Sequence, residues 1–288
     1  MSPLLILGCI GTYFCFLLLI AWRTSRNATS ASYYLGNKAS PWYAVAFGLI
    51  GDSLSGVTFI SVPGRVASAQ FSYMQVVLGY VVGYVVIAQV LLPMYYRLNL
   101  TSIYSYLQQR FGRASQKSGA FFFLLSRTTG AAARLYLAAN IIQAFVFDAW
   151  GIPFALTVSV IILLILAYTL KGGIRTLVWT DTFQSSFLIL GVVLSIWAIA
   201  RELDLDLSGI VAAVRDGGNS QVFFWDWQEK RYFWKQFLSG VSLAIVMTGL
   251  DQNMMQKNLS CRSLREAQWN IYAFTGVMLV VNALFLSL

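Results

Sequence analysis

The sequence predicts an all-α protein, a polytopic transmembrane helical bundle with about eight spanning helices. Of the 288 residues, 58% are hydrophobic and 11% are charged, and the mean hydropathy is +0.67. A soluble domain averages about 45–50% apolar and about 25% charged residues. The composition therefore argues against a soluble enzyme, and also against a disordered chain, which needs low hydrophobicity. Apolar runs of about 20 residues, long enough to cross roughly 30 Å of hydrocarbon, complete the prediction.

Eight such apolar runs are the expected spanning helices: 3–22, 42–62, 72–96, 119–147, 152–170, 177–200, 236–255 and 271–288. Several contain Gly, Ser or Thr, which membrane helices tolerate where they contact one another. The first run could be mistaken for a signal peptide. However, it starts without Lys or Arg, its apolar part is too long, and no clear small-residue cleavage site follows it. We therefore expect an uncleaved helix.

The side-chain inventory excludes several kinds of chemistry. Histidine is absent, so the chain has no Ser-His-Asp triad, no His-ligated zinc or haem and no histidine proton relay. Three cysteines cannot form a disulfide framework. No pairing of a nucleophile with a base, and no metal-binding constellation, is recognisable. We therefore expect no catalytic residues and no enzyme activity.

The basic residues predict the orientation in the membrane. Twelve of the 20 Lys and Arg residues follow the first, third, fifth and seventh runs. Only six lie in the opposite loops, where six acidic residues accompany them. The positive-inside rule places the richer loops in the cytoplasm and the N-terminus outside. We thus expect a multi-pass protein of the cytoplasmic (inner) membrane, and interpret the net charge of +9 as a topology signal rather than as nucleic-acid binding.

The long outer loop, about 201–235, is the one sizeable polar region. Its apolar residues predict one face of a short interfacial helix: Leu205, Leu207, Ile210, Val211 and Val214. Seven aromatic residues then favour an aromatic belt at the membrane surface, with a ligand lid as the alternative: Phe223, Phe224, Trp225, Trp227, Tyr232, Phe233 and Trp234.

The second run carries polar residues where a charge is expensive. Asp52, Ser55 and Thr58 recur at i, i+3 and i+6, and so lie on nearly one helical face. Three glycines weaken the helix and a Pro-Gly pair is expected to end it: Gly48, Gly51, Gly56, Pro63 and Gly64. A weakened helix in mid-membrane can free backbone carbonyls as oxygen ligands, as in the sites of secondary transporters. The alternative is a small-residue packing face.

Two arginines lie inside the fourth run. Arg127 is within about two turns of the cytoplasmic end and could extend its side chain to the interface. Arg134 lies deeper, so it needs a partner. The sequence leaves two roles open for it, an ion pair with a carboxylate such as Asp52 or Asp181, or binding of an anionic substrate.

The sixth run adds a third polar group. Asp181, Gln184 and Ser185 share a helical face, and a carboxylate with hydroxyl neighbours suits sodium, a hard cation that prefers oxygen ligands. The alternative is a carboxylate neutralised by a basic residue near the interface. At the end of the seventh run, 249–258, we expect a polar network at a helix terminus rather than a binding site.

Five stretches of the chain, in the order in which they occur along it, resemble the sodium:solute symporter family. Four carry most of the resemblance and the fifth is weaker: 33–38 with 41–43; 55–59 with 63–64; 172–173 with 178–181 and Gln184; 251–252 with 256–257; and 100–103 with 106–107 and 110–112. No single match is strong, but the five are in register over nearly the whole chain. The resemblance implies the five-plus-five inverted-repeat fold of the leucine transporter, preceded by an extra N-terminal helix.

The resemblance also implies how the chain is divided. Residues 1–288 would be a single transmembrane transporter domain with a truncated second repeat. Its parts would be the extra helix 3–22, the first repeat of five helices 42–200, the extracytoplasmic loop 201–235, and the first two helices of the second repeat, 236–288. Core helices eight to ten would be missing, and with them the hydroxyl half of the main sodium site, so this chain alone should not transport.

Site residues follow from the same resemblance. The main sodium site would use the backbone carbonyls of Gly51 and Leu54, while Asp181 would line the ion path and serve a second sodium, with Ser185 as its hydroxyl neighbour. Substrate would be held near the helix break by a second set: Asp52, Ser55, Thr58, Gln75 and Arg134. The Ser-x-x-Thr-Phe pattern is similar to that of sialic-acid-type members, whereas Asp52 is closer to proline-type members, shifted by one position.

The implied function is secondary active transport. We expect sodium-coupled symport of a small polar or anionic solute (a sugar acid, an amino acid or a carboxylate) by alternating access. Sodium would be the coupling ion, the solute and the lipid bilayer the other partners, and nucleic acid is not expected. Two alternatives remain open: proton coupling through Asp52 or Asp181, and a membrane sensor whose transporter-like domain feeds a signalling domain.

Overall fold

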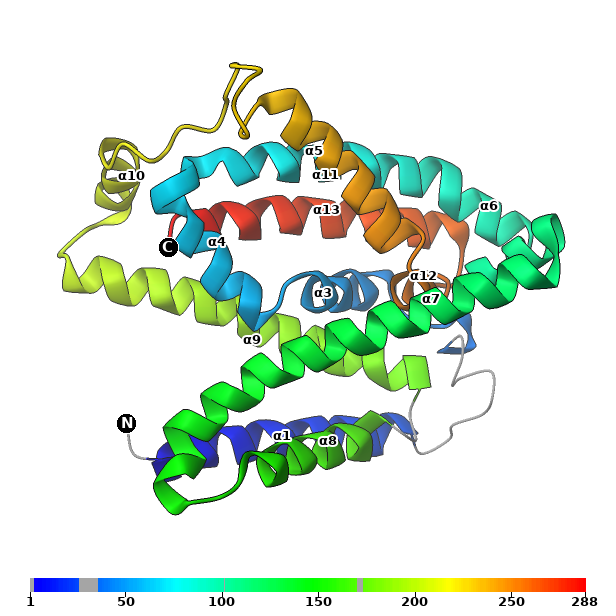
Figure 1. The fold of residues 1–288 in the computed structure, drawn as a ribbon, viewed down its shortest axis with the longest axis horizontal. Helices are drawn as coiled ribbons and strands as arrows, with labels where there is room; N and C mark the ends of the chain where they lie inside the picture. Colours follow the sequence, from blue (N-terminus) through cyan, green and yellow to red (C-terminus); the bar gives the residue numbers. More distant parts are fainter. Residues whose placement is uncertain (1–2, 26–35, 101, 170–172) are drawn as a thin grey trace. The chain divides into compact units, whose positions relative to one another are not determined.

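The computed structural model describes residues 3–25, 36–100, 102–169 and 173–288 (Figure 1). The described residues form helices and contain no β-strand, apart from an isolated bridge between Ser40 and Cys261. The α-helices are α1 (Pro3–Ser25), α3 (Trp42–Ser53), α4 (Gly56–Ala69), α5 (Tyr73–Val86), α6 (Leu92–Arg97), α7 (Ile103–Ile142), α8 (Phe154–Thr169), α9 (Gly173–Glu202), α10 (Leu207–Asp216), α11 (Phe233–Ala244), α12 (Gln252–Asn258) and α13 (Leu264–Leu286).

Short 3-10 or π segments connect or extend these helices: η1 (Gly36–Lys38), η2 (Gln70–Ser72), η3 (Ile87–Leu91), η4 (Gln143–Phe147), η5 (Asp148–Trp150) and η6 (Ile245–Gly249). The predicted all-α class is confirmed.

Five helical segments of the described residues are long and apolar enough to cross a membrane: Pro3–Ser25, Gly56–Arg97, Ile103–Trp150, Thr176–Glu202 and Leu264–Leu286. A sixth candidate is a pair of helices, Phe233–Gly249 and Gln252–Leu259, that meet at an angle of 66°. The transmembrane bundle is therefore confirmed, while the number of eight spans stays a prediction.

The chain divides into two compact units. One comprises Met1–Lys38 and Leu100–Thr180, and in it α8 packs against α1 and α7. The other comprises Ala39–Asn99 and Asp181–Leu288. In this second unit α5 packs against α11, and α13 packs against α3 and α5 (Figure 1). The predicted site residues of the second, sixth and seventh runs all lie in the second unit.

Two glycines set the crossing of α5 and α11. A Cβ atom on Gly79 would collide with the carbonyl oxygen of Phe237, and one on Gly240 would collide with the carbonyl oxygen of Val76. The two backbones thus approach more closely than any side chain would permit. Close approach through small residues is a principal source of helix association in membranes, where lipid offers no hydrophobic drive.

The second apolar run is not one helix. It divides into α3 and α4 at Leu54 and Ser55, whose backbones are extended, with φ −106° and ψ 136° at Leu54. The predicted common helical face of Asp52, Ser55 and Thr58 is therefore wrong, because the break separates Asp52 from the other two. The expected end at Pro63 is also wrong, since α4 continues to Ala69. A proline removes one backbone hydrogen bond from a helix, and membrane helices tolerate that loss.

The outer loop holds the predicted short helix, α10, whose first turn is capped by Asp206. Its Oδ1 atom accepts a hydrogen bond from the backbone N–H of Gly209 at 2.6 Å. Beyond α10, aromatic rings pack on one another, with 5.0 Å between the ring centroids of Trp225 and Phe233 and 5.3 Å between those of Phe233 and Phe237. Their position at a membrane surface stays a prediction.

Candidate functional site

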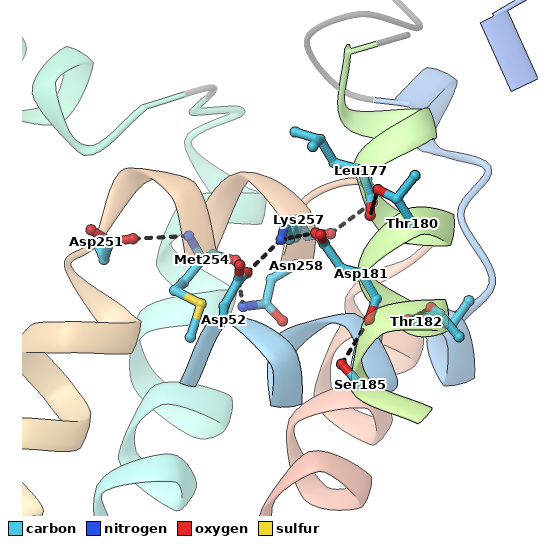
Figure 2. Close-up of polar contacts among 12 residues, drawn as sticks. Asp52, Leu177, Thr180, Asp181, Thr182, Ser185, Asp251, Met254, Lys257 and Asn258 are labelled. Atoms are coloured by element: carbon cyan, nitrogen blue, oxygen red, sulfur yellow. Dashed lines mark hydrogen bonds and ion pairs between the residues drawn. The ribbon is translucent and has the colours of Figure 1, made fainter. Parts of the chain in front are cut away.

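Three charged side chains from three helices meet beside the break between α3 and α4 (Figure 2). Asp52 comes from the last turn of α3, Asp181 from α9 and Lys257 from α12. The Lys257 Nζ atom donates to Asp52 Oδ2 at 2.5 Å and also to Asp181 Oδ2. We call these three residues the charge cluster.

The charge cluster is buried unevenly. The Lys257 side chain is only 2% exposed, whereas those of Asp52 and Asp181 are 21% and 13% exposed. Two carboxylates against one ammonium leave one formal negative charge when all three groups are ionised. Because an uncompensated charge in a poorly solvated site is costly, the cluster favours the approach of one further monovalent cation from the side of the carboxylates.

Close packing of α3 on α9 positions two members of the charge cluster. A Cβ atom on Gly51 would lie 2.6 Å from Ser185 Oγ, so only glycine fits there without a shift. The hydroxyl of Thr182 donates to the carbonyl oxygen of Ala44 at 2.8 Å. The Ser185 hydroxyl donates to the carbonyl oxygen of Asp181 at 2.7 Å, and its oxygen keeps two lone pairs that can accept or coordinate.

A hydrogen-bonded frame holds α12, which carries Lys257. Asp251 caps the helix by accepting from the backbone N–H of Met254 at 3.0 Å. The hydroxyl of Ser260 donates to the carbonyl oxygen of Lys257 at 2.7 Å, and the buried amides of Asn258 and Asn270 are hydrogen bonded to each other. The predicted polar network at this helix terminus is confirmed for Asp251.

The same segment contains the residue that sequence reasoning missed. Lys257 follows the seventh apolar run, so the positive-inside rule predicts a charge in a cytoplasmic loop, but its side chain is buried and completes the charge cluster. The only signal for it was the presence of two carboxylates inside apolar runs, which require a cation. That signal could not distinguish Lys257 from Arg134, because all these residues are distant in sequence.

The break changes the hydrogen bonding of the backbone. In a continuous helix the N–H of Ser55 would donate to the carbonyl of Gly51, but here it donates to Thr58 Oγ1 at 3.2 Å. The carbonyl of Gly51 therefore lacks its helical donor, and that of Leu54 belongs to an extended residue. Both are suitable hard oxygen ligands for a small cation. The Ser55 and Thr58 hydroxyl oxygens lie 3.5 Å apart at the start of α4, directly after the break in the chain.

Gln75 and Arg134 are the remaining predicted substrate residues. Gln75 is completely buried, and its amide is occupied by the outer loop: it donates to the carbonyl of Arg231 at 2.9 Å and accepts from the N–H of Phe224 at 3.3 Å. Arg134 is exposed on α7, in the other unit. Both carboxylates named above as its possible partners bind Lys257. A role of Arg134 in binding a substrate stays a prediction.

Comparison with known proteins adds to this geometry. A model of the sodium:solute symporter family matches residues 33–288. Sodium-coupled monocarboxylate transporter 1 of Mus musculus is 27% identical over 277 residues, which are 93% of this chain and 43% of that protein. The sodium/sialic acid symporter SiaT of Proteus mirabilis is 23% identical over 296 residues, covering 97% and 54% respectively. The chain thus spans about half the length of the curated relatives it matches.

The fold has a counterpart among solved structures. The substrate-bound, outward-open state of a Na+-coupled sialic acid symporter, described as having a novel Na+ site, superposes with a TM-score of 0.83 at 22% identity. The match covers 97% of this chain and 59% of that structure. The relatives are membrane transporters, not enzymes. Together with the family match over most of the chain, these similarities show that the chain belongs to the sodium:solute symporter family.

Proposed function

We propose that the protein containing this chain couples the uptake of a small organic anion to the sodium gradient across the cytoplasmic membrane, with the N-terminus outside. One observation carries the proposal, the position of the charge cluster directly beside the break between α3 and α4. A broken helix supplies carbonyl oxygens, and the charge cluster supplies one excess negative charge. Both features favour a small monovalent cation, and the named relatives are sodium-coupled.

The sodium ligands in this proposal are the carbonyls of Gly51 and Leu54 on one side and the side chains of Asp181 and Ser185 on the other. Gly51 and Ser185 are in direct contact, and Asp181 lies one turn before Ser185 on α9. Lys257 pairs with Asp52 and Asp181, and its positive charge reduces their combined charge of −2 to a net charge of −1. The site would then release sodium more readily than two unpaired carboxylates would, which a transport cycle requires.

The solute in this proposal is held by Ser55 and Thr58 at the start of α4 and by Asp52 at the end of α3. Hydroxyl groups donate well to a carboxylate, and the relatives' printed substrates, monocarboxylates and sialic acid, are carboxylates. Coupling would arise because both ligands stabilise the same arrangement of α3 and α4, so that each raises the population that binds the other.

Uptake by the complete gene product in proteoliposomes tests the proposal. Radiolabelled lactate and N-acetylneuraminate, offered separately, should accumulate with an inward sodium gradient. Accumulation of both should fall to the level of empty liposomes when choline replaces sodium at a clamped pH and potential. Uptake that continues unchanged without sodium would contradict sodium coupling.

Proton coupling is the second candidate, because the charge cluster contains carboxylates that are largely shielded from solvent. An inward proton gradient without sodium would then drive uptake. Asp181→Asn separates the two cases: it should weaken sodium stimulation if Asp181 binds sodium, and should abolish proton-driven uptake if Asp181 carries a proton.

A further inference from the structure

A pocket of about 330 Å³ opens along α4, the helix that follows the break. Thr58, Ser61 and Arg65 line it from α4, at the spacing of one helical face. At 1.5 Å per residue, this wall runs about 10 Å from Thr58 to Arg65. The opposite wall includes Lys230 and Arg231 of the loop that precedes α11.

The charge of this pocket is positive. Arg65 and Lys230 are exposed, and neither forms an ion pair with another described residue. Arg231 is held more firmly: its Nε atom pairs with Glu229 at 3.2 Å, and its guanidinium lies 4.2 Å from the ring centroid of Phe224. Glu229 therefore offsets one of the three cations, and the other two remain available to a ligand.

The pocket is firmly built although it is open. The carbonyl oxygen of Arg231 accepts from the buried Gln75 amide, and that of Lys230 accepts from Gln236 at 2.9 Å. Gln70, at the turn between α4 and α5, accepts from the Arg231 guanidinium at 3.5 Å. The two cationic walls are thereby fixed relative to each other, and polar groups lie between them.

We propose that this pocket is an outer binding site for a small carboxylate, held by Arg65 and Lys230 before the solute reaches Thr58 and Ser55. Identification of that carboxylate with the transported solute rests on the proposed function, whereas the anion selectivity of the pocket does not. A cleft lined by one sign of charge raises the local concentration of the opposite charge and speeds its association. The site would thus act on the apparent KM of the solute and leave the maximal rate unchanged.

Thiol modification tests the pocket without any need for transport. In the complete protein, with Cys9, Cys15 and Cys261 replaced, Ser61→Cys places a thiol in the pocket wall, and Ala67→Cys places one on an exposed part of α4 that does not line the pocket. We compare the rate constants with which two methanethiosulfonate reagents modify each thiol, one carrying an anionic sulfonatoethyl group and the other a cationic trimethylammonioethyl group. Each rate constant is divided by that of the same reagent with mercaptoethanol in solution. We expect the Ser61→Cys thiol to favour the anionic reagent by about fivefold or more relative to the Ala67→Cys thiol.

Charge removal completes the experiment. Arg65→Gln together with Lys230→Gln should abolish this preference, while Arg215→Gln, an exposed cation of α10 outside the pocket, should retain it. In sodium-free buffer, lactate or N-acetylneuraminate should protect the Ser61→Cys thiol. Equal reagent preference at both thiols, or protection by chloride as strong as by lactate, would overturn the assignment.

Transport kinetics distinguish failure of this inference from failure of the proposed function. If uptake depends on sodium, the double variant Arg65→Gln, Lys230→Gln should raise the apparent KM for the anion roughly three- to tenfold at low ionic strength, with the maximal rate and the sodium dependence unchanged. An unchanged KM alongside sodium-dependent uptake overturns the outer site alone. Sodium-independent uptake overturns the proposed function alone, since the reagent preference is measured without sodium.

Discussion

Lys257 on α12 donates to Asp52 at the end of α3 over 2.5 Å, although 205 residues separate them in the sequence. Through the same ammonium group, α3 is connected to Asp181 on α9. One lysine therefore joins three helices at the point where the second apolar run is broken. Any ion that binds at the carboxylates acts on the contacts of all three helices, and this connection can convert ion binding into a change of helix arrangement.

Removal of this lysine should destabilise the protein strongly. Lys257→Met leaves two largely buried carboxylates without a counter-ion, which costs about 3–5 kcal/mol for a buried pair. Thermal unfolding of the purified protein in nanodiscs measures the loss as a lower melting temperature. Adding Asp181→Asn to Lys257→Met should recover part of it, because the repulsion between the carboxylates is then removed. The matched control is Lys235→Met, an exposed lysine that donates to the carbonyl of Trp227; a similar loss there would contradict a special role for Lys257.

Neutralising Asp181 should reduce the affinity for sodium. Asp181→Asn removes the formal negative charge that remains after pairing with Lys257, and we expect at least about a tenfold rise in the sodium concentration needed for half-maximal thermal stabilisation. Titration of the melting temperature with sodium chloride against choline chloride measures this. Asp226→Asn, in the outer loop away from the charge cluster, serves as the control. The role of Asp181 would be wrong if both variants titrate like the unaltered protein.

The contact between Gly51 and Ser185 predicts an asymmetry between two glycines that flank the break. Gly51→Ala puts a methyl group against the Ser185 hydroxyl and should cost about 1–3 kcal/mol, while sodium stabilisation weakens because α3 moves away from α9. Gly56→Ala, just after the break, meets nothing within 4 Å and should be tolerated. Ser185→Gly in the Gly51→Ala background should restore stability. Melting temperatures of these three variants and of the unaltered protein decide the matter, and equal effects of the two alanine substitutions would refute it.

The crossing of α5 and α11 should be the least tolerant glycine contact of the second unit. Gly79→Ala or Gly240→Ala would bring Cβ against backbone atoms, which cannot move aside as a side chain can, so each should cost about 3 kcal/mol or more. Gly276→Ala on α13 has open space around its Cβ and is the control. Size-exclusion profiles and melting temperatures report the outcome; a Gly79→Ala protein as stable as the Gly276→Ala protein would show that the crossing is looser than described.

Acidification should loosen α10. The hydrogen bond from the N–H of Gly209, and then that from Ser208, hold the pKa of Asp206 below its ordinary value. A lowered folded-state pKa means that the carboxylate stabilises the helix fully above the unfolded pKa of about 3.9, and that this contribution disappears as the pH falls through the folded value. Hydrogen exchange of residues 207–216, corrected for intrinsic rates, should show the loss of protection. Asp206→Asn keeps a capping oxygen without titrating, so its protection should not vary over this range.

Sequence reasoning predicted local features better than distant contacts. Apolar runs, α10, the α9 face with Asp181 and Ser185, and a discontinuity near Gly51 all follow from neighbouring residues. Two predictions about the second apolar run were wrong: the common helical face of Asp52, Ser55 and Thr58, and the end of the helix at Pro63. The break lies between Asp52 and Ser55, where Leu54 and Ser55 adopt extended backbones, and Pro63 is accommodated inside α4. Apolar periodicity alone does not locate such a break to the residue.

The membrane class, the family and the need for a cation near Asp52 and Asp181 could all be predicted without a structure, because composition, run length and motif order are properties of the chain alone. The identity of that cation depends on how the helices pack. Lys257 lies 76 residues from Asp181 and farther still from Asp52, and no periodicity links positions so distant. The same holds for Gly51 against Ser185, and for the outer loop that occupies Gln75. Such contacts arise from helix packing, in which many small contacts sum to fix one arrangement.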